Sequence, residues 1–590
     1  MTAASQVSLS HHHRGARMKT GIKLASLAFF TAFPGITLFG ADHIPDAGTI
    51  YREMQPQRQL PPQLLQTEPP IDETPFTETR GVRVLVKGFI FRGYESISKE
   101  SDLQALAADA IGKELSIGEL KALTLKVTAY LKTKGWFLSR AWLPDQDVSS
   151  GFIEIRIVQG RSDGSIVFKR DKTVRIKEEI LTRIGQKAVQ PDTPLNEPLL
   201  KRALLLMNEL PGVSAKATLS PGSLPGKTNV EIGVTEGPLV SGLVWYDNNG
   251  NRYTGQSRGN TMLFINDPFH YGDQLSLAFT GAQGLYQGQT RYSFPLSSSG
   301  LKGNVAYTAI HYKIVDGDLA SSNFSGYSDG VDVGLSYPLL RSRTANVTSS
   351  IGYNYKTLID RQGDVGYSDK HSNSGSIGIA GDGYDALFGG GYTLWNIGAA
   401  TGTLHQSDPG SMVDAIATQT EGDFTRVNCS LARLQHVSDG ITFNLSWTGQ
   451  MALKNLDTSE KFALGGPYGI RAYPAGEAFG DQGQIFNADI RYTLPLPVTW
   501  GAFQLDGLID AGQITLQKHQ TAAVNPATSI NTYWLAGAGM GLNYSRGRKV
   551  SIRTCWAHVL GDNPGRSIAG NNADGKDDKS RCWLQAQLFF

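Results

Sequence analysis

From Pro238 to the C-terminal Phe590, the chain lacks helical periodicity and alternates between apolar and polar positions. Segments of about ten residues, each with one apolar face, are separated by polar loops, which is the signature of a membrane β-barrel. Examples are QLSLAFTGA, NVAYTAIHY, ITFNLSWTGQ, QIFNADIRYTL and VSIRTCWAHV. Strands can cross a bilayer only if they close on themselves and pair every backbone group. We therefore predict an all-β transmembrane barrel of about sixteen antiparallel strands over residues 238–590.

The connections between these segments alternate in character. Three segments end in an aromatic and a proline before a short connection, as in YSFPL at Tyr292, SYPL ending at Leu339 and YTLPLP at Tyr492. We assign these turns to the periplasmic girdle and the Gly/Asp/Ser-rich segments 316–330 and 561–580 to long extracellular loops. The start of the first strand, next to the preceding units, and the C-terminal end of the last strand then both lie on the periplasmic side. An antiparallel barrel with both chain ends on one side has an even number of strands.

The three cysteines are far apart and include no CxxC pair, so they favour neither a zinc cage nor a disulfide framework. The last segment, CWLQAQLFF, places Cys582, Leu588 and Phe590 on one apolar face, which we expect to meet lipid. The alternation of the preceding segment turns Cys555 toward the lumen. Cys555 and Cys582 are thus expected to remain unbonded.

Two α+β units precede the barrel, at 75–160 and 161–237. The first reads as a strand, two helices and a hairpin, and its second helix begins with the capping box Ser116 to Glu119. The second unit repeats this β-α-α-β-β order, so the chain contains an internal structural repeat. An exposed sheet edge in such a unit can pair with an extended segment of another chain.

The N-terminal region reads as a leader followed by a tether. After Met18, two lysines and the apolar run LASLAFFTAFPGITLFG indicate a secretory signal within residues 1–41, with Met18 as the true start. Cleavage is expected near Gly40 or Ala41, and an uncleaved anchor is the alternative. Residues 42–74 hold a helix, PDAGTIYREMQ, with Asp46 as its N-cap, and a stiff Pro-rich linker.

A Gly/Pro-rich insert, GGPYGIRAYPAGEAFGDQG, covers residues 465–483 between two strands. It is longer than a turn requires, so we expect it to fold into a space and dock there. The later strand YWLAGAGMGLNYS places Gly537, Gly539 and Gly541 on one face, where small residues leave room in a lumen for a loop.

The insert resembles the inward-folded loop of the two-partner secretion transporters, outer-membrane barrels of the POTRA-barrel superfamily that export haemolysins and adhesins. In that family an arginine in a VRGY-like motif reaches an aspartate in an FxDxG-like motif on a later strand. The matches here are IRAY and LIDAG, which depart from the family pattern at Ala472 and Leu508. The residues carried over are Ile470, Arg471, Ala472 and Tyr473 of the loop, and Leu508, Asp510 and Gly512 of the strand.

The resemblance also implies partners and a location. It implies two periplasmic POTRA domains, an N-terminal plug helix inside the barrel, and a secreted β-helical exoprotein that arrives unfolded in the periplasm. Outer-membrane lipid and the barrel assembly machinery, for its own insertion, are further expected partners, and the transporter is expected to be a monomer. An assembly factor of the same superfamily that inserts other outer-membrane proteins is the first alternative, and a passive porin is the second.

Composition and motifs argue against other classes of function. A net charge of +2 without a basic, aromatic-rich block disfavours nucleic-acid binding. GYSDG around Ser328 matches G-x-S-x-G, which leaves an outer-membrane esterase as an alternative, but it lacks the strand-turn-helix context of a nucleophile elbow. Neither HExxH nor a P-loop occurs in the sequence. We therefore expect no enzymatic activity, no cofactor and no metal.

Overall fold

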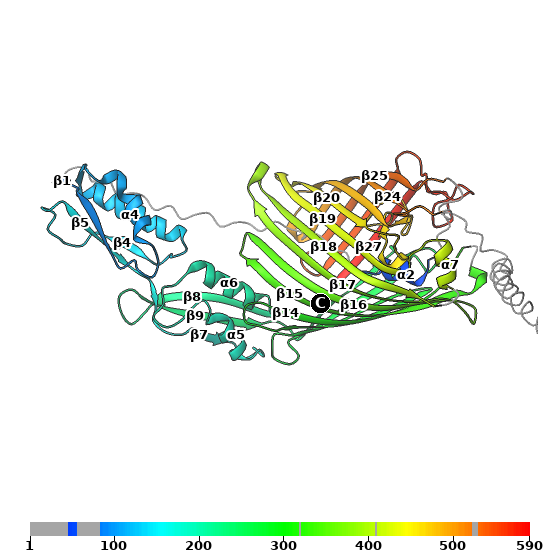
Figure 1. Ribbon diagram of the computed structural model, residues 1–590, viewed down its shortest axis with the longest axis horizontal. Coiled ribbons are helices and arrows are strands. Elements are labelled where there is room, and N and C mark those ends of the chain that lie inside the picture. Colours follow the sequence, from blue (N-terminus) through cyan, green and yellow to red (C-terminus); the bar gives the residue numbers. More distant parts are fainter. Residues whose placement is uncertain (1–44, 56–82, 318–319, 408–409, 522–528) are drawn as a thin grey trace, which may run out of the picture.

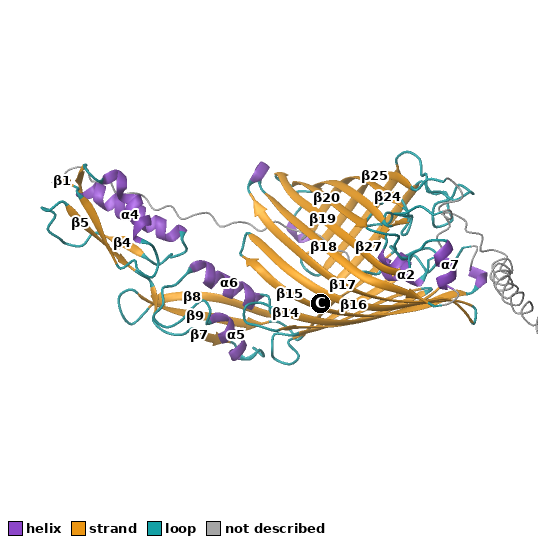
Figure 2. Cartoon of the chain, in the orientation of Figure 1, coloured by secondary structure: helices purple, strands orange, loops and turns teal. Residues whose placement is uncertain are grey.

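A closed barrel preceded by two small α+β units makes up most of the described part of the chain (Figure 1). The computed structural model describes residues 45–55, 83–317, 320–407, 410–521 and 529–590. The predicted leader and the Pro-rich linker lie outside these residues. Figure 2 shows the two units at one end of the barrel and helix α2 (Ala47–Glu53) at the other end.

The barrel has sixteen antiparallel strands, and the last strand pairs with the first, which confirms the predicted number and closure. These strands are β10 Val240–Asp247, β11 Arg258–Asn266, β12 Gln274–Ala282, β13 Leu285–Pro295, β14 Lys302–Lys313, β15 Phe324–Arg341, β16 Ala345–Gln362, β17 Val365–Asp385, β18 Gly391–Gln406, β19 Gly422–Ser438, β20 Ile441–Ala452, β23 Gln482–Thr493, β24 Ala502–Thr515, β25 Thr532–Arg546, β26 Val550–Val559 and β27 Ser580–Phe589. Outward-facing side chains such as Met540 and Leu542 are exposed and apolar, as a lipid-facing surface requires.

One of the two predicted long loops is wrong. Strand β15 begins at Phe324, so the second half of segment 316–330 is strand and not loop. Ser328 therefore lies inside β15 and is only 2% exposed. The prediction failed because Gly, Ser and Asp suit lumen-facing strand positions as well as loops. The other predicted loop, 561–580, does connect β26 to β27, although Ser580 is already the first residue of β27.

The cysteines behave as the alternation predicts. In the β26–β27 ladder Cys555 lies opposite Trp583, and Trp556 lies opposite Cys582. Adjacent residues of a strand face opposite sides, so Cys555 faces the lumen and Cys582 faces outward. All three cysteines are free.

The two α+β units share one topology, which confirms the predicted repeat. In each sheet the central strand pairs in parallel with a strand that precedes the helices and antiparallel with the strand directly before it, which gives the shared orders β2-β5-β4 and β7-β9-β8. In the second unit the two-residue β6 also pairs in parallel with β9, so that this sheet has four strands. The first unit comprises β1 Arg83–Leu85, β2 Gly88–Arg92, α3 Glu100–Ala107, η1 Ala108–Ala110, β3 Glu114–Ser116, α4 Ile117–Thr133, β4 Arg140–Trp142 and β5 Phe152–Val158. The second comprises β6 Arg161–Ser162, β7 Val167–Arg170, α5 Glu178–Gly185, α6 Glu197–Asn208, β8 Val213–Pro221 and β9 Lys227–Glu236. In each unit the helices pack on one face of the sheet around a separate apolar core.

Polar contacts fix the second unit to the barrel. Glu209, which follows α6, pairs with Lys302 at 2.9 Å and with Arg341 at 2.5 Å, and both of these cations belong to barrel strands. Arg202 of α6 donates to the carbonyl of Pro338 at 2.7 Å. These contacts define the repeat end of the barrel, and the opposite end is called the far end.

The remaining elements lie in connections. At the far end the connections contain η2 Ala320–Ser322, α7 Gly410–Ile416, η4 Thr458–Glu460, β21 Phe462–Ala463 and β22 Phe479–Gly480. At the repeat end they contain η3 Leu387–Gly389 and η5 Val498–Trp500. Within the described part of the chain, no helix is long and apolar enough to cross a membrane.

A loop folded into the barrel lumen

The connection between β20 and β23 starts at the far end and folds into the barrel. It spans residues 453–481, and strands β21 and β22 pair with each other to form a short hairpin within it. The predicted segment 465–483 lies inside this connection except for Gln482 and Gly483, which belong to β23. We call residues 453–481 the inner loop.

The inner loop packs its apolar side chains against the barrel wall. Ile470, Ala472 and Tyr473 are fully buried, and Leu508 of β24 is 3% exposed against them. A Cβ atom added to Gly512 would lie 2.6 Å from the Leu464 side chain, so this glycine allows the loop to approach. The other buried members of this cluster are Phe462, Leu464, Ala478, Ile485, Ile514, Tyr533, Leu535, Ala557 and Val559.

The predicted lumen glycines have different neighbours. A Cβ atom added to Gly537 would lie 2.5 Å from the Cβ of Ala472, so Gly537 makes room for the loop tip. Added Cβ atoms at Gly539 and Gly541 would instead meet the carbonyls of Trp556 and Thr554 in the neighbouring strand. Ala472 itself does not adopt a positive φ. The turn therefore does not require the glycine of the VRGY-like pattern.

Arg471 is held by two carboxylates. Its Nε and Nη2 donate to the two oxygens of Asp510 at 2.9 and 2.6 Å, and its backbone N–H donates to the same carboxylate at 2.9 Å. Nη2 also donates to Asp489 of β23 at 2.6 Å. Asn487 donates to Asp510 and to the Gly469 carbonyl. A planar guanidinium can satisfy two carboxylates in this way because its five N–H groups have a fixed geometry.

Asp489 was not identified from the sequence, although a signal for it exists. It lies in the segment QIFNADIRYTL, three residues before the outward-facing Tyr492, and its neighbour Ile490 is exposed. Alternation therefore assigns Asp489 to the lumen face, in the strand that directly follows the inner loop. A lumen-facing acid at this position is a natural candidate partner for the loop arginine.

Helix α2 lies inside the far end of the barrel and contacts both the wall and the inner loop. Its N-cap Asp46 accepts from the Thr49 backbone N–H, as predicted, and also from the hydroxyl of Thr458 in η4 at 2.7 Å. The Ala47 N–H donates to Asp360 of β16 at 2.8 Å. Arg52 donates to the carbonyl of Lys461 at 2.9 Å. The helix is therefore bonded to the lumen from both of its ends.

Buried ion pairs tie the base of the inner loop to the wall. Glu460 of η4 pairs with Lys356 of β16 at 2.5 Å and with Arg426 of β19 at 2.6 Å. Burial raises the pKa of this carboxyl, but the two cations outweigh burial and lower it to about 2. Asp457 pairs with Lys370 of β17 at 2.7 Å. These pairs were not predicted from the sequence, because their partners come from strands far apart in the chain.

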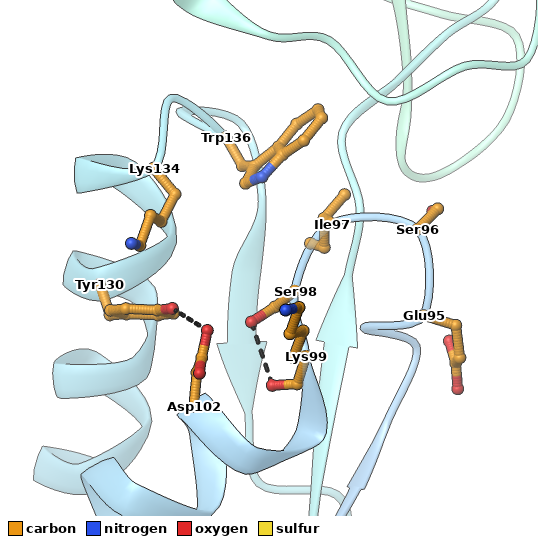
Figure 3. A pocket seen from close by; sticks show the side chains of 9 residues that line it. All are labelled: Glu95, Ser96, Ile97, Ser98, Lys99, Asp102, Tyr130, Lys134 and Trp136. Atoms are coloured by element: carbon orange, nitrogen blue, oxygen red, sulfur yellow. Dashed lines mark hydrogen bonds between the residues drawn. The ribbon is translucent and has the colours of Figure 1, made fainter.

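A separate pocket of about 420 Å³ lies in the first α+β unit (Figure 3). It is bounded by the β2–α3 connection and the end of α4, where Tyr130 donates to Asp102 at 2.9 Å. Its lining side chains are mostly polar and include no Cys, His or Arg. The described residues hold no group of three His, Cys, Asp or Glu placed to bind a metal ion.

The inner loop and α2 form the candidate functional site, and comparisons with known proteins bear on it. The family model for haemolysin secretion/activation protein ShlB/FhaC/HecB matches residues 226–544, and a ShlB-type POTRA domain model matches residues 84–160. The heme/hemopexin transporter protein HuxB of Haemophilus influenzae (strain 86-028NP) is 25% identical over 92% of this chain and 94% of its own. The outer membrane transporter CdiB of Dickeya dadantii is 22% identical over 70% of this chain and 72% of its own.

A solved structure has the same fold. CdiB from Escherichia coli superposes with a TM-score of 0.70 at 20% identity, covering 88% of this chain and 93% of that one. At this level of identity the match concerns the fold alone.

We predict that Gly537→Ala displaces the tip of the inner loop. The added methyl group would overlap Ala472, and overpacking of this kind costs about 1–3 kcal/mol. Cells carrying the variant should become more sensitive to large antibiotics such as vancomycin. Gly507→Ala, on the outward face of β24, is the matched control and should leave sensitivity unchanged. Equal sensitivity of both variants would contradict the assigned contact.

We predict that acid strengthens docking of the inner loop through Glu477. This side chain is 3% exposed, and burial raises the pKa of its carboxyl from 4.5 to about 7, although Asn563 and the Ala573 N–H donate to it. The docked loop therefore holds the proton more tightly than a released loop does. Docking is strongest below about pH 4.5, weakens as the pH rises to 7 and is constant above 7, with a total change of about 3 kcal/mol.

Planar-bilayer recordings check this prediction. Large openings of the wild-type barrel should be rarer at pH 5 than at pH 8, and Glu477→Gln should remove the difference because glutamine does not titrate. If Glu477→Gln keeps the full pH dependence of the large openings, a group other than Glu477 causes it.

Proposed function

The chain belongs to the haemolysin secretion/activation protein family, and from this premise we propose that it exports a large exoprotein through its own barrel. It is an outer-membrane transporter of the two-partner secretion type, with its POTRA domains in the periplasm. The repeat end of the barrel is then periplasmic and the far end extracellular. We identify the two α+β units with POTRA domains 1 and 2.

The inner loop carries this proposal. It lies in the lumen, where an apolar cluster packs it against the wall and polar contacts at Arg471, Glu460 and Asp457 fix its position. Helix α2 likewise packs Ile50 and Tyr51 against apolar residues of the barrel and is bonded individually to Asp360 and Thr458. Contents attached in this way can be released without unfolding the barrel. An exporter of polypeptide needs a lumen from which the inner loop and α2 can be released.

The POTRA sheets supply a means of capture. The edge strands are β2 and β4 in the first domain, and β7 with the short β6 on one side and β8 on the other side in the second. An unfolded exoprotein can add a strand at such an edge, where backbone groups lack a partner within the sheet. Contacts from Glu209 and Arg202 hold the second domain at the periplasmic mouth of the barrel. A captured segment is thus delivered close to the lumen.

The energy for export comes from the cargo. A β-helical exoprotein buries apolar surface and pairs its backbone as it folds outside the cell, so its emergence becomes irreversible. This scheme requires no nucleotide and no catalytic residue. Ser328 is buried within β15, which is not a nucleophile elbow, so we assign no esterase activity to it.

We predict that Arg471→Ala abolishes or strongly reduces export. The change removes the cation that buried Asp510 and Asp489 share and leaves Asp489 only the more distant Arg491, at 4.0 Å. Removal of one partner from a buried pair costs about 3–5 kcal/mol. Arg433→Ala is the matched control, because Arg433 also forms a two-bonded pair, with Asp385, but at the periplasmic rim of the barrel. The measurement is secretion of a co-expressed candidate exoprotein, sought among large β-helical proteins encoded beside this gene, with folded barrel checked by heat-modifiable migration.

Two results would contradict the proposal. Normal export by a folded Arg471→Ala barrel would show that export does not need the contacts of Arg471 with Asp510 and Asp489. Depletion of other outer-membrane proteins on loss of the gene, with no exoprotein secreted by the wild type, would instead indicate an assembly factor.

We predict that tethering α2 to the inner loop blocks export. A Cβ atom added to Gly48 would lie 2.3 Å from Oγ1 of Thr458, so Gly48→Cys and Thr458→Cys together place two sulfurs within disulfide reach. The oxidised double variant should secrete little exoprotein, and a reductant should restore secretion. Each single variant is a control. Full export by the disulfide-bonded protein would show that the helix does not have to leave.

A further inference from the structure

Trp583 of the last strand contacts the tip of the inner loop. Its indole Nε1 donates to the backbone carbonyl of Arg471 at 2.7 Å. Its neighbours Cys582 and Leu584 are exposed outward, so the indole points into the lumen. Indole nitrogen is only a donor, and a carbonyl is only an acceptor, so this contact has one possible direction.

This bond extends the attachment of Arg471 around the wall. The guanidinium bonds to β23 and β24 through Asp489 and Asp510, whereas the carbonyl bonds to β27. Between β24 and β27 lie β25, where Gly537 admits Ala472, and β26. One loop residue therefore connects three strands within the last five of the barrel.

The same strand closes the barrel through a short seam. Strand β27 pairs with β10 over five residue pairs, whereas it pairs with β26 over nine. The side chain of Asn248 continues the seam beyond the ladder, since it donates to the Cys582 carbonyl at 2.9 Å and accepts from the Leu584 N–H at 2.7 Å. These two residues flank Trp583. The seam and the loop tip thus meet at one point of β27.

We propose that Trp583 is a positioning residue for the inner loop, which ties the loop tip to the strand that closes the barrel. Docking of the loop and closure of the seam then support each other, because both hold the same segment of β27. This inference deepens the proposed function, since it names a further residue that holds the loop whose release export requires. It can be tested without measuring export.

Cys555 is a native reporter for this contact. It faces the lumen directly opposite Trp583, whereas Cys582 faces outward, as does Cys429, whose cross-strand neighbour Ile397 is exposed on the outer face. In the full-length protein with Cys429→Ala and Cys582→Ala, a water-soluble maleimide reports access to the lumen beside the loop tip. Heat-modifiable migration verifies that each barrel is folded.

We expect Trp583→Phe to raise the labelling rate of Cys555 about fivefold, which corresponds to the loss of one hydrogen bond. Trp556→Phe, one strand away on the outward face, is the control and should not change the rate. Phenylalanine is also smaller than tryptophan and leaves a gap near Cys555, so the substitution is repeated together with Arg471→Ala. Because that change already frees the tip, Trp583→Phe should then add nothing.

Two outcomes would overturn the inference. An unchanged rate for Trp583→Phe in a barrel that responds to Arg471→Ala would show that the indole does not position the loop. The same acceleration with and without Arg471→Ala would show a local gap instead of a released tip. Normal export by Arg471→Ala would contradict the proposed function but would leave the labelling result intact.

Discussion

Closure of the sheet is the constraint on which the rest of this structure depends. Strands that cross a bilayer must pair every backbone group, so the last strand has to meet the first. Sixteen strands closed in this way enclose a lumen that their own side chains do not fill. The inner loop and helix α2 fill that space at its far end. Trp583 reaches the loop tip just beyond the five-pair ladder of β10 and β27, where Asn248 continues the closure.

The chemistry of the lumen differs from that of an ordinary core. The POTRA domains are held by apolar clusters, whereas the inner loop and α2 combine apolar packing against the wall with ion pairs and hydrogen bonds at Arg471, Glu460 and Asp46. A buried ion pair adds little net stability compared with apolar packing, but it specifies one geometry and is costly to leave half broken. Such ion pairs hold the loop in a unique docked position. When they all separate together, the barrel wall stays intact. That combination fits contents that must move during transport.

Much of the fold was predictable because its signals are local. Alternation over about ten residues predicted the strands, their number and the opposite facing of Cys555 and Cys582, and all of these agree with the structure. The repeated order of strands and helices predicted the two small domains. The prediction of a loop over 316–330 was wrong, because small polar residues occur in lumen-facing strands as well as in loops and composition alone does not separate the two. The structure brings Arg471 and Asp510 together, as their motifs led us to expect.

The sequence by itself determined the class of protein, the order of its parts and the residues at the loop tip, since periodicity and motifs depend on neighbours along the chain. Only the tertiary structure decided which wall residues receive the loop and the helix. Asp489 is a second carboxylate partner of Arg471. Glu460 is held by Lys356 and Arg426. Trp583 bonds to a carbonyl 112 residues earlier in the chain. These partners are set by the stagger of sixteen strands around a closed lumen, and the stagger follows from the pairing of the whole sheet. No spacing within the sequence encodes it.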